Sequence, residues 1–339
     1  MRNPVNMENT WVEISKSALL HNIREVKSLI GKNTKLISVI KANAYGHGLC
    51  EIADIIENES DYLAVINLDE AKELRESEIK TPIIVLGYTS ESVKDILWAI
   101  QERVELVANS LTHAERLSKL IENSSGGADD LKIHVKIDTG MGRMGIMVEN
   151  AVDYIKKINE LPHLRIKGVM SHFADTVDHK DYAKEQLQKF ENIKFQLFKE
   201  KIEPPLWHIA KTEAIFDFPE SHLDAIRLGV GLYGLWPDKK LIDRVHVTHA
   251  DFNLKPALSW KTKVLQVKDY PKGEFVGYGC THKTKRETKI AIFPVGYYEG
   301  YDRGLSNKSE VLINGKRCPI IGRICMNMSM ADVTDVPKA

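Results

Sequence analysis

The sequence is poor in cysteine, balanced in charge and free of long apolar runs. The four cysteines show no CxxC spacing, and a chain of 339 residues does not need disulfides for stability, so we expect buried, reduced thiols. Lys plus Arg and Asp plus Glu both number 47, so no overall field favours nucleic acid, an anionic membrane or an acidic partner. No apolar run approaches the roughly 18 residues of a membrane span, and the first residues lack the apolar segment of a secretion signal. We therefore expect a cytoplasmic protein without bound metal, whose ligands are recognised in a local site.

Short β-branched runs alternate with helical segments from about residue 36. Eight runs fit this pattern: KLISVIK, YLAVIN, PIIVLG, VELVA, KIHVKID, RIKGVMSHF, LWHIA and AIRLGVGLYG. Between them, segments such as LDEAKELRESEI and AVDYIKKINEL carry apolar residues at helical spacing. This alternation predicts a parallel sheet, and eight units predict a (β/α)8 barrel of the TIM type, preceded by a helix in SALLHNIREVKSLI.

The pattern changes after about residue 240. Alternating segments such as ALSWKTKVLQVKDY and EVLINGKRC are joined by turn sequences, PKGE and NGK, and no long helix is indicated. A chain of this length accommodates two domains. We therefore predict an α/β fold in which residues 1–239 form the barrel and residues 240–339 form an all-β domain.

Charged and titratable residues lie where the predicted barrel strands end. The loops at the carboxyl ends of barrel strands face one mouth. Each residue alone has an ordinary explanation, but fully buried Lys and Arg are rare unless they are paired, and several meeting at one mouth indicate a site for an anion. The residues expected there are Lys41, Lys136, Asp138, Arg143, His172, His208 and Arg227.

Lys41 is the most informative of these residues. A lone lysine at a strand end usually extends its amine to solvent. A lysine that is desolvated beside other cations instead has a lowered pKa and becomes a nucleophilic amine, the form that condenses with an aldehyde. YGHG taken alone is explained as a turn. Together with Thr212 and the backbone of LGVG, however, the Tyr45 hydroxyl would make a phosphate cradle, as barrels often do after strands seven and eight. The pattern points to a phosphorylated aldehyde cofactor.

Several motifs resemble, in order and rough spacing, those of the pyridoxal-phosphate-dependent alanine racemases. They are VIKANAYGHG, KIDTGMGRMG, MSHF, HIAKTEA, IRLGVGLYG, EFVGYGCTH, PVGYYEGYDR and IGRICMN. The likeness extends from about residue 10 to the last residue. It implies a barrel followed by a β-domain, pyridoxal 5′-phosphate as cofactor, and a homodimer in which the partner subunit completes each active site. It also implies interconversion of L- and D-alanine, which supplies D-alanine for peptidoglycan.

The resemblance assigns two bases to opposite faces of the substrate. Lys41 matches the lysine that binds the cofactor covalently and also acts as one base, and Tyr278 matches the tyrosine that the partner subunit contributes as the other. Arg227 matches the residue facing the pyridine nitrogen; because arginine stays protonated, it donates a hydrogen bond and makes the ring a weaker electron sink. The other matches to cofactor-binding positions are Tyr45, His172, His208, Thr212, Gly229 and Val230. Without the resemblance, His172 would be read as a satisfied histidine at a strand end.

Further positions match residues near the substrate. Arg143 matches the residue that contacts the phenolic oxygen of the cofactor and the substrate carboxylate, and Met326 matches one lent by the partner subunit near that carboxylate. Lys136 matches a lysine that is carbamylated in many members, a reaction that turns one of two repelling cations into an anion. Three more residues resemble those that line the access corridor: Tyr297, Arg303 and Arg323. For these three, an ordinary surface role is an equal alternative.

The sequence departs from the family pattern at three places. HIAKTEA has Lys211 and Thr212 where Asn-Ser is common, so the hydroxyl is kept and a cation is added that either tightens cofactor binding or points to solvent. Asn327 stands where an aspartate is common, which removes a charge beside Tyr278. The sequence stops at MADVTDVPKA, within the predicted β-domain, whereas family members continue with further strands and an active-site tyrosine. The missing side chain would widen the pocket, so the preference for alanine over serine stays open.

Other functions are compatible with parts of the pattern. Serine or broad specificity is the nearest variant, and a catalytically impaired cofactor-binding fragment is another. A decarboxylase of basic amino acids would need different acid groups and a longer chain, and DTGMGR and EFVGYGCTH argue against it. A non-catalytic pyridoxal-phosphate carrier would be a single barrel, so the region after residue 240 argues against that function.

Overall fold

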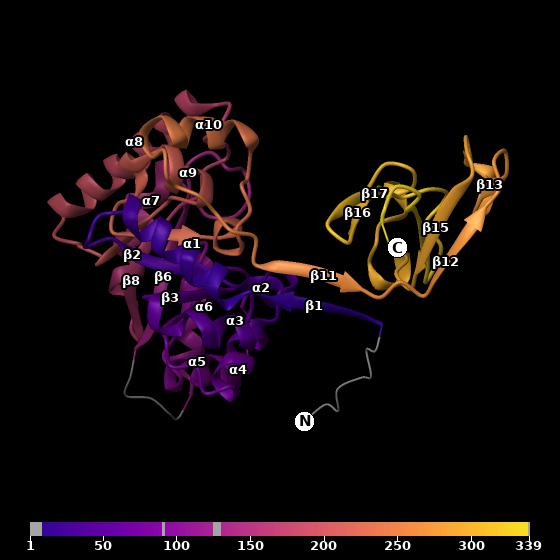
Figure 1. The fold of residues 1–339 in the computed structure, drawn as a ribbon. Coiled ribbons are helices and arrows are strands. Elements are labelled where there is room, and N and C mark those ends of the chain that lie inside the picture. Colours follow the sequence, from indigo (N-terminus) through magenta and orange to yellow (C-terminus); the bar gives the residue numbers. More distant parts are fainter. Residues whose placement is uncertain (1–8, 90–91, 125–129, 338–339) are drawn as a thin grey trace. The chain divides into compact units, whose positions relative to one another are not determined.

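The computed structural model describes residues 9–89, 92–124 and 130–337 (Figure 1). Contacts divide these residues into two units. The barrel unit runs from Ser15 to Ala257, and the β unit combines the described residues before Ser15 with those from Leu258 onward. The β unit is therefore discontinuous in sequence.

Eight parallel strands form the main sheet of the barrel unit. They are β2 (Lys35–Val39), β3 (Tyr62–Val65), β4 (Ile83–Val85), β5 (Val104–Ala108), β6 (Leu131–Asp138), β8 (Leu164–Met170), β9 (Leu206–His208) and β10 (Ala225–Leu228). Neighbours pair in the order β10, β2, β3, β4, β5, β6, β8 and β9. The two ends of this order meet, because the backbone N–H of Arg227 donates to the carbonyl of Ala210 at 3.1 Å. The predicted barrel is confirmed.

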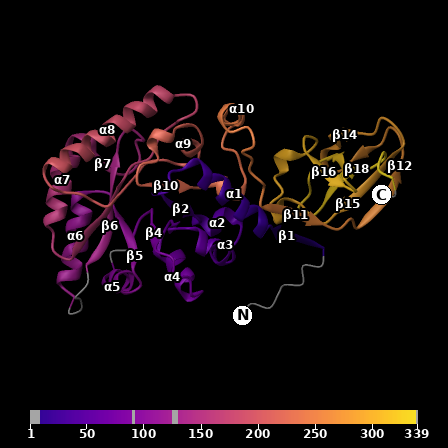
Figure 2. The ribbon, with the colours of Figure 1, turned by 60° about the vertical axis from the view of Figure 1, so that its left-hand side comes forward.

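Helices cover the outside of this barrel (Figure 2). Polar caps mark where several begin: the Ser15 side chain accepts from the backbone N–H of Ala18, and the Asn67 side chain accepts from that of Glu70. The helices are α1 (Lys16–Leu29), α3 (Leu49–Ile56), α4 (Leu68–Glu76), α5 (Val93–Gln101), α6 (Leu111–Glu122), α7 (Val148–Glu160), α8 (Lys180–Lys199), α9 (Thr212–Asp217) and α10 (Lys239–Thr248). A short strand, β7 (Ile146–Met147), pairs with the end of β6.

The interior of the barrel holds an apolar layer contributed by β2, β3, β4, β5, β8, β9 and β10. Its members are Ile37, Val39, Ala64, Ile84, Val107, Met170, Leu206 and Ala225. Burial of a large aliphatic side chain contributes about 1.5–3 kcal/mol, so this layer stabilises the strands against one another. It gives the polar residues at the strand ends a rigid base.

The two units divide later in the chain than residue 239. α10 lies in the segment that we assigned to the β-domain, and its Leu241 and Val245, four residues apart, are buried. The helix contacts α9 of the barrel unit, and the backbone N–H of Ala257 donates to the carbonyl of Tyr233 at 3.0 Å. These contacts keep residues 240–257 with the barrel. The expectation that no long helix follows residue 240 is corrected, because α10 has ten residues and is held by its buried apolar pair and by Arg244, which donates to the Val177 carbonyl at 3.0 Å.

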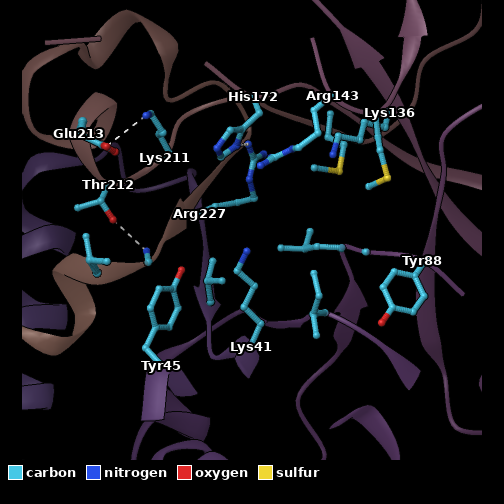
Figure 3. Close-up of a pocket in the computed structure, with 18 residues that line it drawn as sticks. Lys41, Tyr45, Tyr88, Lys136, Arg143, His172, Lys211, Thr212, Glu213 and Arg227 are labelled. Atoms are coloured by element: carbon cyan, nitrogen blue, oxygen red, sulfur yellow. Dashed lines mark hydrogen bonds and ion pairs between the residues drawn. The ribbon is translucent and has the colours of Figure 1, made fainter. Parts of the chain in front are cut away.

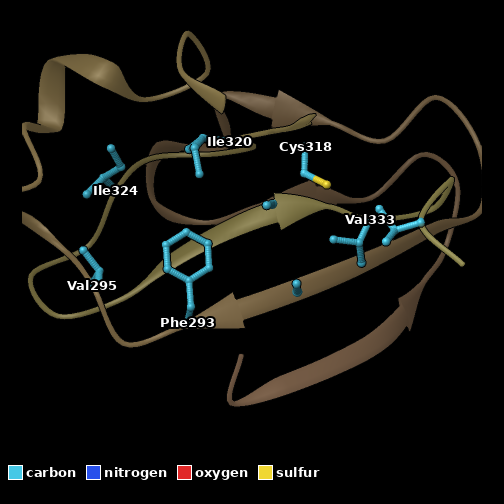
Figure 4. Close-up of a cluster of buried hydrophobic side chains, with 9 residues drawn as sticks. Phe293, Val295, Cys318, Ile320, Ile324 and Val333 are labelled. Carbon is cyan, nitrogen blue, oxygen red and sulfur yellow. The ribbon is translucent and has the colours of Figure 1, made fainter. Parts of the chain in front are cut away.

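The β unit consists of antiparallel strands. β1 (Thr10–Ile14) pairs with β11 (Leu258–Thr262), and β15 (Thr288–Phe293) lies between β12 (Gln266–Tyr270) and β18 (Ser329–Asp332). Two further pairs are β13 (Phe275–Val276) with β14 (His282–Lys283) and β16 (Glu310–Ile313) with β17 (Lys316–Pro319). The buried cluster of this unit includes Phe293, Val295, Cys318, Ile320, Ile324 and Val333 (Figure 4). The predicted all-β organisation is confirmed.

The NGK sequence forms the turn that its residues predict. Asn314 and Gly315, between β16 and β17, have φ values of 48° and 75°. Two-residue hairpin turns of this kind require positive φ at both positions, which Asn-Gly adopts readily.

Three properties expected from composition concern membrane spans, thiols and metal ligands. Among the described helices, none is long and apolar enough to cross a membrane. The four cysteines are free, but only Cys318 is buried and Cys280 is exposed, so the expectation of buried thiols is corrected for the other three. In the described ranges, His, Cys, Asp and Glu side chains form no group of three or more suited to a metal ion.

Candidate active site

A cavity of about 420 Å³ lies at the carboxyl ends of the barrel strands (Figure 3). Predicted site residues that line it together are Lys41, Tyr45, Lys136, Arg143, His172, Thr212, Arg227, Gly229 and Val230. Apolar surface is added by Val39, Ile66, Leu86, Met144 and Met170. The strand ends therefore gather cations and hydroxyl groups around one partly apolar space.

Lys41 follows β2, and its amine points into the cavity (Figure 3). Burial lowers the pKa of this amine, and Arg143 lowers it further, whereas Glu70 opposes the shift. A lowered pKa increases the fraction of neutral, nucleophilic amine near neutral pH. The structure thus gives Lys41 the environment that a covalent cofactor linkage requires.

The backbone after Lys41 forms a left-handed turn. Residues 42–45 all have φ between 52° and 55°, a conformation that costs roughly 1–2 kcal/mol per L-residue. The Glu70 carboxylate holds the turn, because it accepts from the backbone N–H of Asn43 at 3.1 Å and from that of Ile66 at 3.0 Å. The turn brings the side chains at both of its ends into the same cavity.

A small polar recess lies beside Tyr45. The Thr212 hydroxyl accepts from the backbone N–H of Gly229 at 3.0 Å. A Cβ atom at position 229 would lie 3.1 Å from the Tyr45 hydroxyl and 3.6 Å from that of Thr212. Glycine therefore leaves open a space bordered by two hydroxyls, which suits a phosphate group.

Arg227 is 3% exposed and is held by hydrogen bonds from both terminal nitrogens. Nη1 donates to His208 Nδ1 at 2.7 Å and to the His208 carbonyl at 2.9 Å. Nη2 donates to the carbonyls of Ser171 at 2.6 Å and Ile209 at 2.9 Å, and to His172 Nδ1 at 3.2 Å. Burial, and then Arg143, lowers the pKa of Arg227 to about 9, so the guanidinium stays protonated at neutral pH.

His172 is a neutral imidazole on the cavity wall. Burial, and then the charges of Arg227 and Lys211, lower its pKa to about 2. Nδ1 is therefore free to accept from Arg227. His208 lies behind the cavity and contacts Arg227 from within the barrel.

Asp138, the last residue of β6, organises the loop that carries Arg143. One carboxylate oxygen accepts from the backbone N–H groups of Gly140 at 2.9 Å, Met141 at 2.7 Å and Gly142 at 3.1 Å. The other accepts from that of Arg143 at 3.0 Å. Burial opposes ionisation, but these hydrogen bonds outweigh it and lower the pKa of Asp138. The loop is thereby fixed with Arg143 at the cavity.

Lys136 is 5% exposed and lines the same cavity as Arg143. Burial, and then the charges of Arg143 and Arg227, lower the pKa of Lys136 to about 8. An amine with this pKa is partly neutral under ordinary conditions. Lys136 is thus chemically distinct from the exposed lysines of the surface.

Lys211 points along the cavity wall to Glu213. The two charged groups are 3.2 Å apart, and the side chains are 20% and 22% exposed (Figure 3). The sequence left open whether this cation faces the phosphate recess or solvent. The structure instead pairs it with a carboxylate beside the recess.

Tyr278 and Met326 lie in the β unit. Tyr278 begins the 3-10 helix η4 (Tyr278–Cys280) and is 70% exposed, and Met326 is 54% exposed. A Cβ atom at Gly279 would lie 3.1 Å from Cζ of Arg323, so the Arg323 guanidinium packs against the backbone next to Tyr278. Both side chains assigned to the partner-facing surface are accessible.

The remaining predicted residues also belong to the β unit. Tyr297 begins the 3-10 helix η5 (Tyr297–Glu299), and Arg303 begins η6 (Arg303–Leu305). Asn327 donates from Nδ2 to Glu299 Oε1 at 2.8 Å. Asn327, which stands where an aspartate is common, is thus hydrogen-bonded to the Glu299 carboxylate.

Sequence reasoning missed three carboxylate or imidazole groups. Glu70 supports the left-handed turn, and Glu105 and His134 are buried at 3% and 0% exposure behind the cavity. A signal for the last two was present, because Glu within VELVA and His within KIHVKID occupy strand positions that are otherwise apolar. Glu70 gave none, since it lies in the first turn of a helix, where acidic residues are common.

The chain folds as an eight-stranded barrel joined to a β unit, and a partly neutral lysine lies at the barrel mouth. These features define a class of two-unit barrel enzymes with an anion-binding site. Comparison with known proteins gives the family. The chain belongs to the alanine racemase family, because the family profile "Alanine racemase, N-terminal domain" matches residues 14–237 and "Alanine racemase, C-terminal domain" matches residues 257–339.

Relatives and solved structures agree with this membership. The alanine racemase of Halothermothrix orenii is 40% identical over 337 residues, which cover 97% of this chain and 84% of that protein. That of Methanococcus maripaludis is 41% identical over 329 residues, which cover 96% and 85%. The structure of alanine racemase from Clostridium difficile has a TM-score of 0.88 at 31% identity and covers 98% of this chain and 84% of its own.

A structure from Bacillus anthracis, described with bound L-Ala-P, has a TM-score of 0.84 at 33% identity and covers 98% and 83%. The resemblance drawn from the motifs is therefore confirmed, as are the barrel-plus-β fold and the assignment to the isomerases.

Proposed function

We propose that the protein is a pyridoxal-phosphate-dependent racemase that interconverts L- and D-alanine. The observation that carries this proposal is that Lys41, Arg227 and the recess at Tyr45 border one cavity. These groups answer the three needs of the cofactor, which are an amine for its aldehyde, a donor for its pyridine nitrogen and hydroxyls for its phosphate. The names of the relatives and solved structures support alanine as the substrate.

The residues present fit pyridoxal 5′-phosphate. Lys41 would hold it covalently through Nζ, Arg227 would donate to the ring nitrogen, and His172 would lie against the ring. The phosphate would occupy the recess bordered by Tyr45, Thr212, Gly229 and Val230. When bound, the cofactor withdraws electrons from the α-carbon of the amino acid and so acidifies its proton.

Two bases on opposite faces of the substrate would give inversion. The Lys41 amine would hold the proton on one face, and Tyr278 of the partner subunit would hold it on the other. Arg143 would contact the substrate carboxylate, with Met326 of the partner subunit nearby. The exposure of Tyr278 and Met326 supports contribution of these side chains to a second copy. We therefore also propose a homodimer with shared sites.

Lys136 is proposed to be carbamylated. Its lowered pKa supplies the neutral amine that adds carbon dioxide, and the resulting anion would pair with Arg143 instead of repelling it. The barrel would thus carry the cofactor-binding residues, and the β-domain those directed to the partner. Supply of D-alanine for peptidoglycan in the cytoplasm is the proposed physiological role.

One experiment separates the racemase from the alternatives. Purified protein supplied with pyridoxal 5′-phosphate is incubated with L-alanine in deuterated water, and the product is analysed by chiral chromatography and mass spectrometry. D-alanine carrying α-deuterium is expected; cofactor binding without exchange would indicate a carrier or an impaired fragment and overturn the proposal. The same assay with L-serine and basic amino acids measures specificity.

Variants assign the two bases. Borohydride reduction of the cofactor-loaded protein is expected to attach the cofactor to Lys41, and Lys41→Ala should abolish the attachment. Tyr278→Phe should lower turnover strongly while attachment at Lys41 is retained. Equal loss of attachment and turnover in Tyr278→Phe would contradict the role given to this tyrosine.

A further inference from the structure

Four buried side chains form a hydrogen-bonded row across the inside of the barrel. The row joins Glu105 on β5, His134 on β6, His208 on β9 and Arg227 on β10. Glu105 Oε2 lies 2.7 Å from His134 Nε2, His134 Nδ1 lies 3.0 Å from His208 Nε2, and His208 Nδ1 lies 2.7 Å from Arg227 Nη1. None of the four is more than 3% exposed, and of the four Arg227 is the one that lines the cavity.

The chemistry of the donors fixes the protons in this row. Arginine has N–H donors and no acceptor, so the 2.7 Å contact exists only while His208 Nδ1 is the acceptor. A neutral imidazole with a free Nδ1 carries its proton on Nε2, which then donates to His134 Nδ1. By the same rule, His134 carries its proton on Nε2 and donates to the Glu105 carboxylate. The row therefore runs in one direction, from a cation to an anion.

A charged imidazole would break this order. If His208 were protonated on both nitrogens, one N–H would face the guanidinium of Arg227 and the other would face His134. Burial, followed by the charge of Arg227, holds the pKa of His208 well below its usual value. Both the geometry and the electrostatics thus keep this imidazole neutral.

Gly168 leaves open the space that the His134 ring occupies. β6 and β8 shift register between Ile133 and His134, and His134 faces Gly168. A Cβ atom at position 168 would lie 2.4 Å from His134 Nδ1 and 2.8 Å from its Cε1. Any side chain at this position would displace the imidazole, so the backbone of β8 specifies where the ring lies.

The acceptors around Arg227 also set which of its N–H groups reaches the cavity. Nη1 and Nη2 donate to carbonyls and to two imidazole nitrogens. Among the contacts of the described residues, Nε is the guanidinium nitrogen that takes no such bond, and it is therefore the donor available to a ligand. A change in the acceptor state of His208 would remove one of the two hydrogen bonds of Nη1 and so weaken the hold on the guanidinium.

We propose that Glu105 and His134 are positioning residues for Arg227, because they hold His208 in the tautomer that accepts from the guanidinium. The charged ends of the row polarise the neutral bonds between them and strengthen each one. The tautomer itself is a property of the cofactor-free protein. Its effect on turnover rests on the proposed function.

Nitrogen-15 NMR of the cofactor-free, histidine-labelled protein tests the tautomer directly. A protonated ring nitrogen and a free one give widely separated signals, and His134→Gln and His208→Gln assign them. Both residues are expected as neutral imidazoles protonated on Nε2. A proton on Nδ1 of His208, or on both of its nitrogens, would overturn the proposal.

Variants of Glu105 test the direction of the row. Glu105→Leu removes the final acceptor, so His134 and His208 are expected to lose their single tautomer. Glu105→Gln accepts and donates, so a mixture of tautomers is expected. Ser118→Ala serves as control, because it removes the hydrogen bond from the buried Ser118 hydroxyl to the Pro162 carbonyl elsewhere in the barrel unit and should leave His208 unchanged.

Gly168→Ala reaches the same row by a different route. The added methyl group should displace His134 and disturb the His208 signal while Glu105 is intact. If Glu105→Leu does not fold, Glu105→Gln and Gly168→Ala carry the test. An unchanged His208 signal in folded Glu105 and Gly168 variants means that the row does not set the tautomer.

Turnover gives the second readout. In an active protein, Glu105→Gln should lower kcat about tenfold, corresponding to the loss of one well-made hydrogen bond, with KM little changed. Ser118→Ala should leave both parameters near their original values. Absence of racemase activity in the unmodified protein would refute the proposed function, while the NMR result would still decide the tautomer.

Discussion

The Asp138 carboxylate accepts a hydrogen bond from the backbone N–H of Arg143 at 3.0 Å, and so the end of a barrel strand sets the place of a cation in the cavity. Its other oxygen accepts from the intervening glycine and methionine N–H groups. The carboxylate does not line the cavity itself. A residue that does not line the cavity therefore fixes the position of a cation that does.

Asp138→Asn tests how much the negative charge of this side chain contributes to ordering the loop. The amide keeps one acceptor oxygen but turns an N–H group toward the N–H of Arg143, so KM for alanine should rise about tenfold and unfolding free energy should fall by about 1–3 kcal/mol. Denaturant unfolding and steady-state kinetics measure the two effects. Asp153→Asn, which removes an exposed ion pair with Lys157, should change stability by less than about 1 kcal/mol.

The stability difference for Asp138 should depend on pH. The pKa of Asp138 is lowered in the folded protein, so its contribution is present above the unfolded value of about 3.9 and is lost as pH falls through the folded value. Unfolding curves of the original protein and of Asp138→Asn should therefore converge below about pH 4. A difference that does not shrink with acid would contradict this account.

Lys136 should take up carbon dioxide in a pH-dependent manner. Carbon-13 bicarbonate is expected to give a carbamate signal in the original protein and none in Lys136→Met. At a fixed concentration of carbon dioxide the signal should grow as pH rises through about 8, since the neutral amine is the reactive form. Lys156→Met, at an exposed ion pair with Glu200, is the control and should keep the signal. A carbamate signal that persists in Lys136→Met would assign the modification elsewhere.

The Lys211–Glu213 pair should tune phosphate binding through its balance of charge. Glu213→Gln frees a cation beside the recess and should tighten binding of pyridoxal 5′-phosphate. Lys211→Met leaves an unpaired carboxylate there and should weaken binding by about tenfold or more. The double variant should lie near the original affinity, because loss of both charges restores the balance at the recess. Unchanged affinity in both single variants, measured by equilibrium titration, would show that the pair does not act on the recess.

Substitution by glycine should stabilise the left-handed turn after Lys41, whereas glycine within a helix is destabilising. Ala42 is exposed at φ 55°, so Ala42→Gly should stabilise the protein by up to about 1 kcal/mol and Ala42→Val should destabilise it. At the exposed Glu185 of α8, by contrast, Gly should be less stable than Ala by about 1 kcal/mol. Thermal unfolding of the two pairs provides the comparison. A loss of stability in Ala42→Gly would mean that this turn is not left-handed in solution.

Patterns that depend on local chemistry were readable from the sequence. The eight strands follow from β-branched runs between helical segments, and the Asn314–Gly315 turn follows from its two residues. Lys41, Arg143 and Arg227 were predicted at one mouth because strand ends converge in a barrel. These inferences needed only periodicity and one rule of topology.

Features that depend on long-range contacts were not readable in this way. The Glu105–His134 contact joins two strands, and neither residue reveals the other in the sequence. The left-handed turn is held by Glu70 from a different helix. α10 was missed because its apolar side is two residues wide and is defined by the surface that it covers.

Thr10 of β1 faces Thr262 of β11, and the whole barrel unit lies between them in the sequence. During synthesis β1 is made before β11, so its edge stays unpaired until β11 has been synthesised. Closing so large a loop from an unfolded chain is entropically unfavourable. The finished barrel removes that difficulty, because Ser15 and Ala257 at its two ends are joined by a 2.8 Å hydrogen bond. Once the barrel has closed, β1 and β11 are therefore close in space before they pair. Errors in barrel closure should then cause misfolding of the β unit.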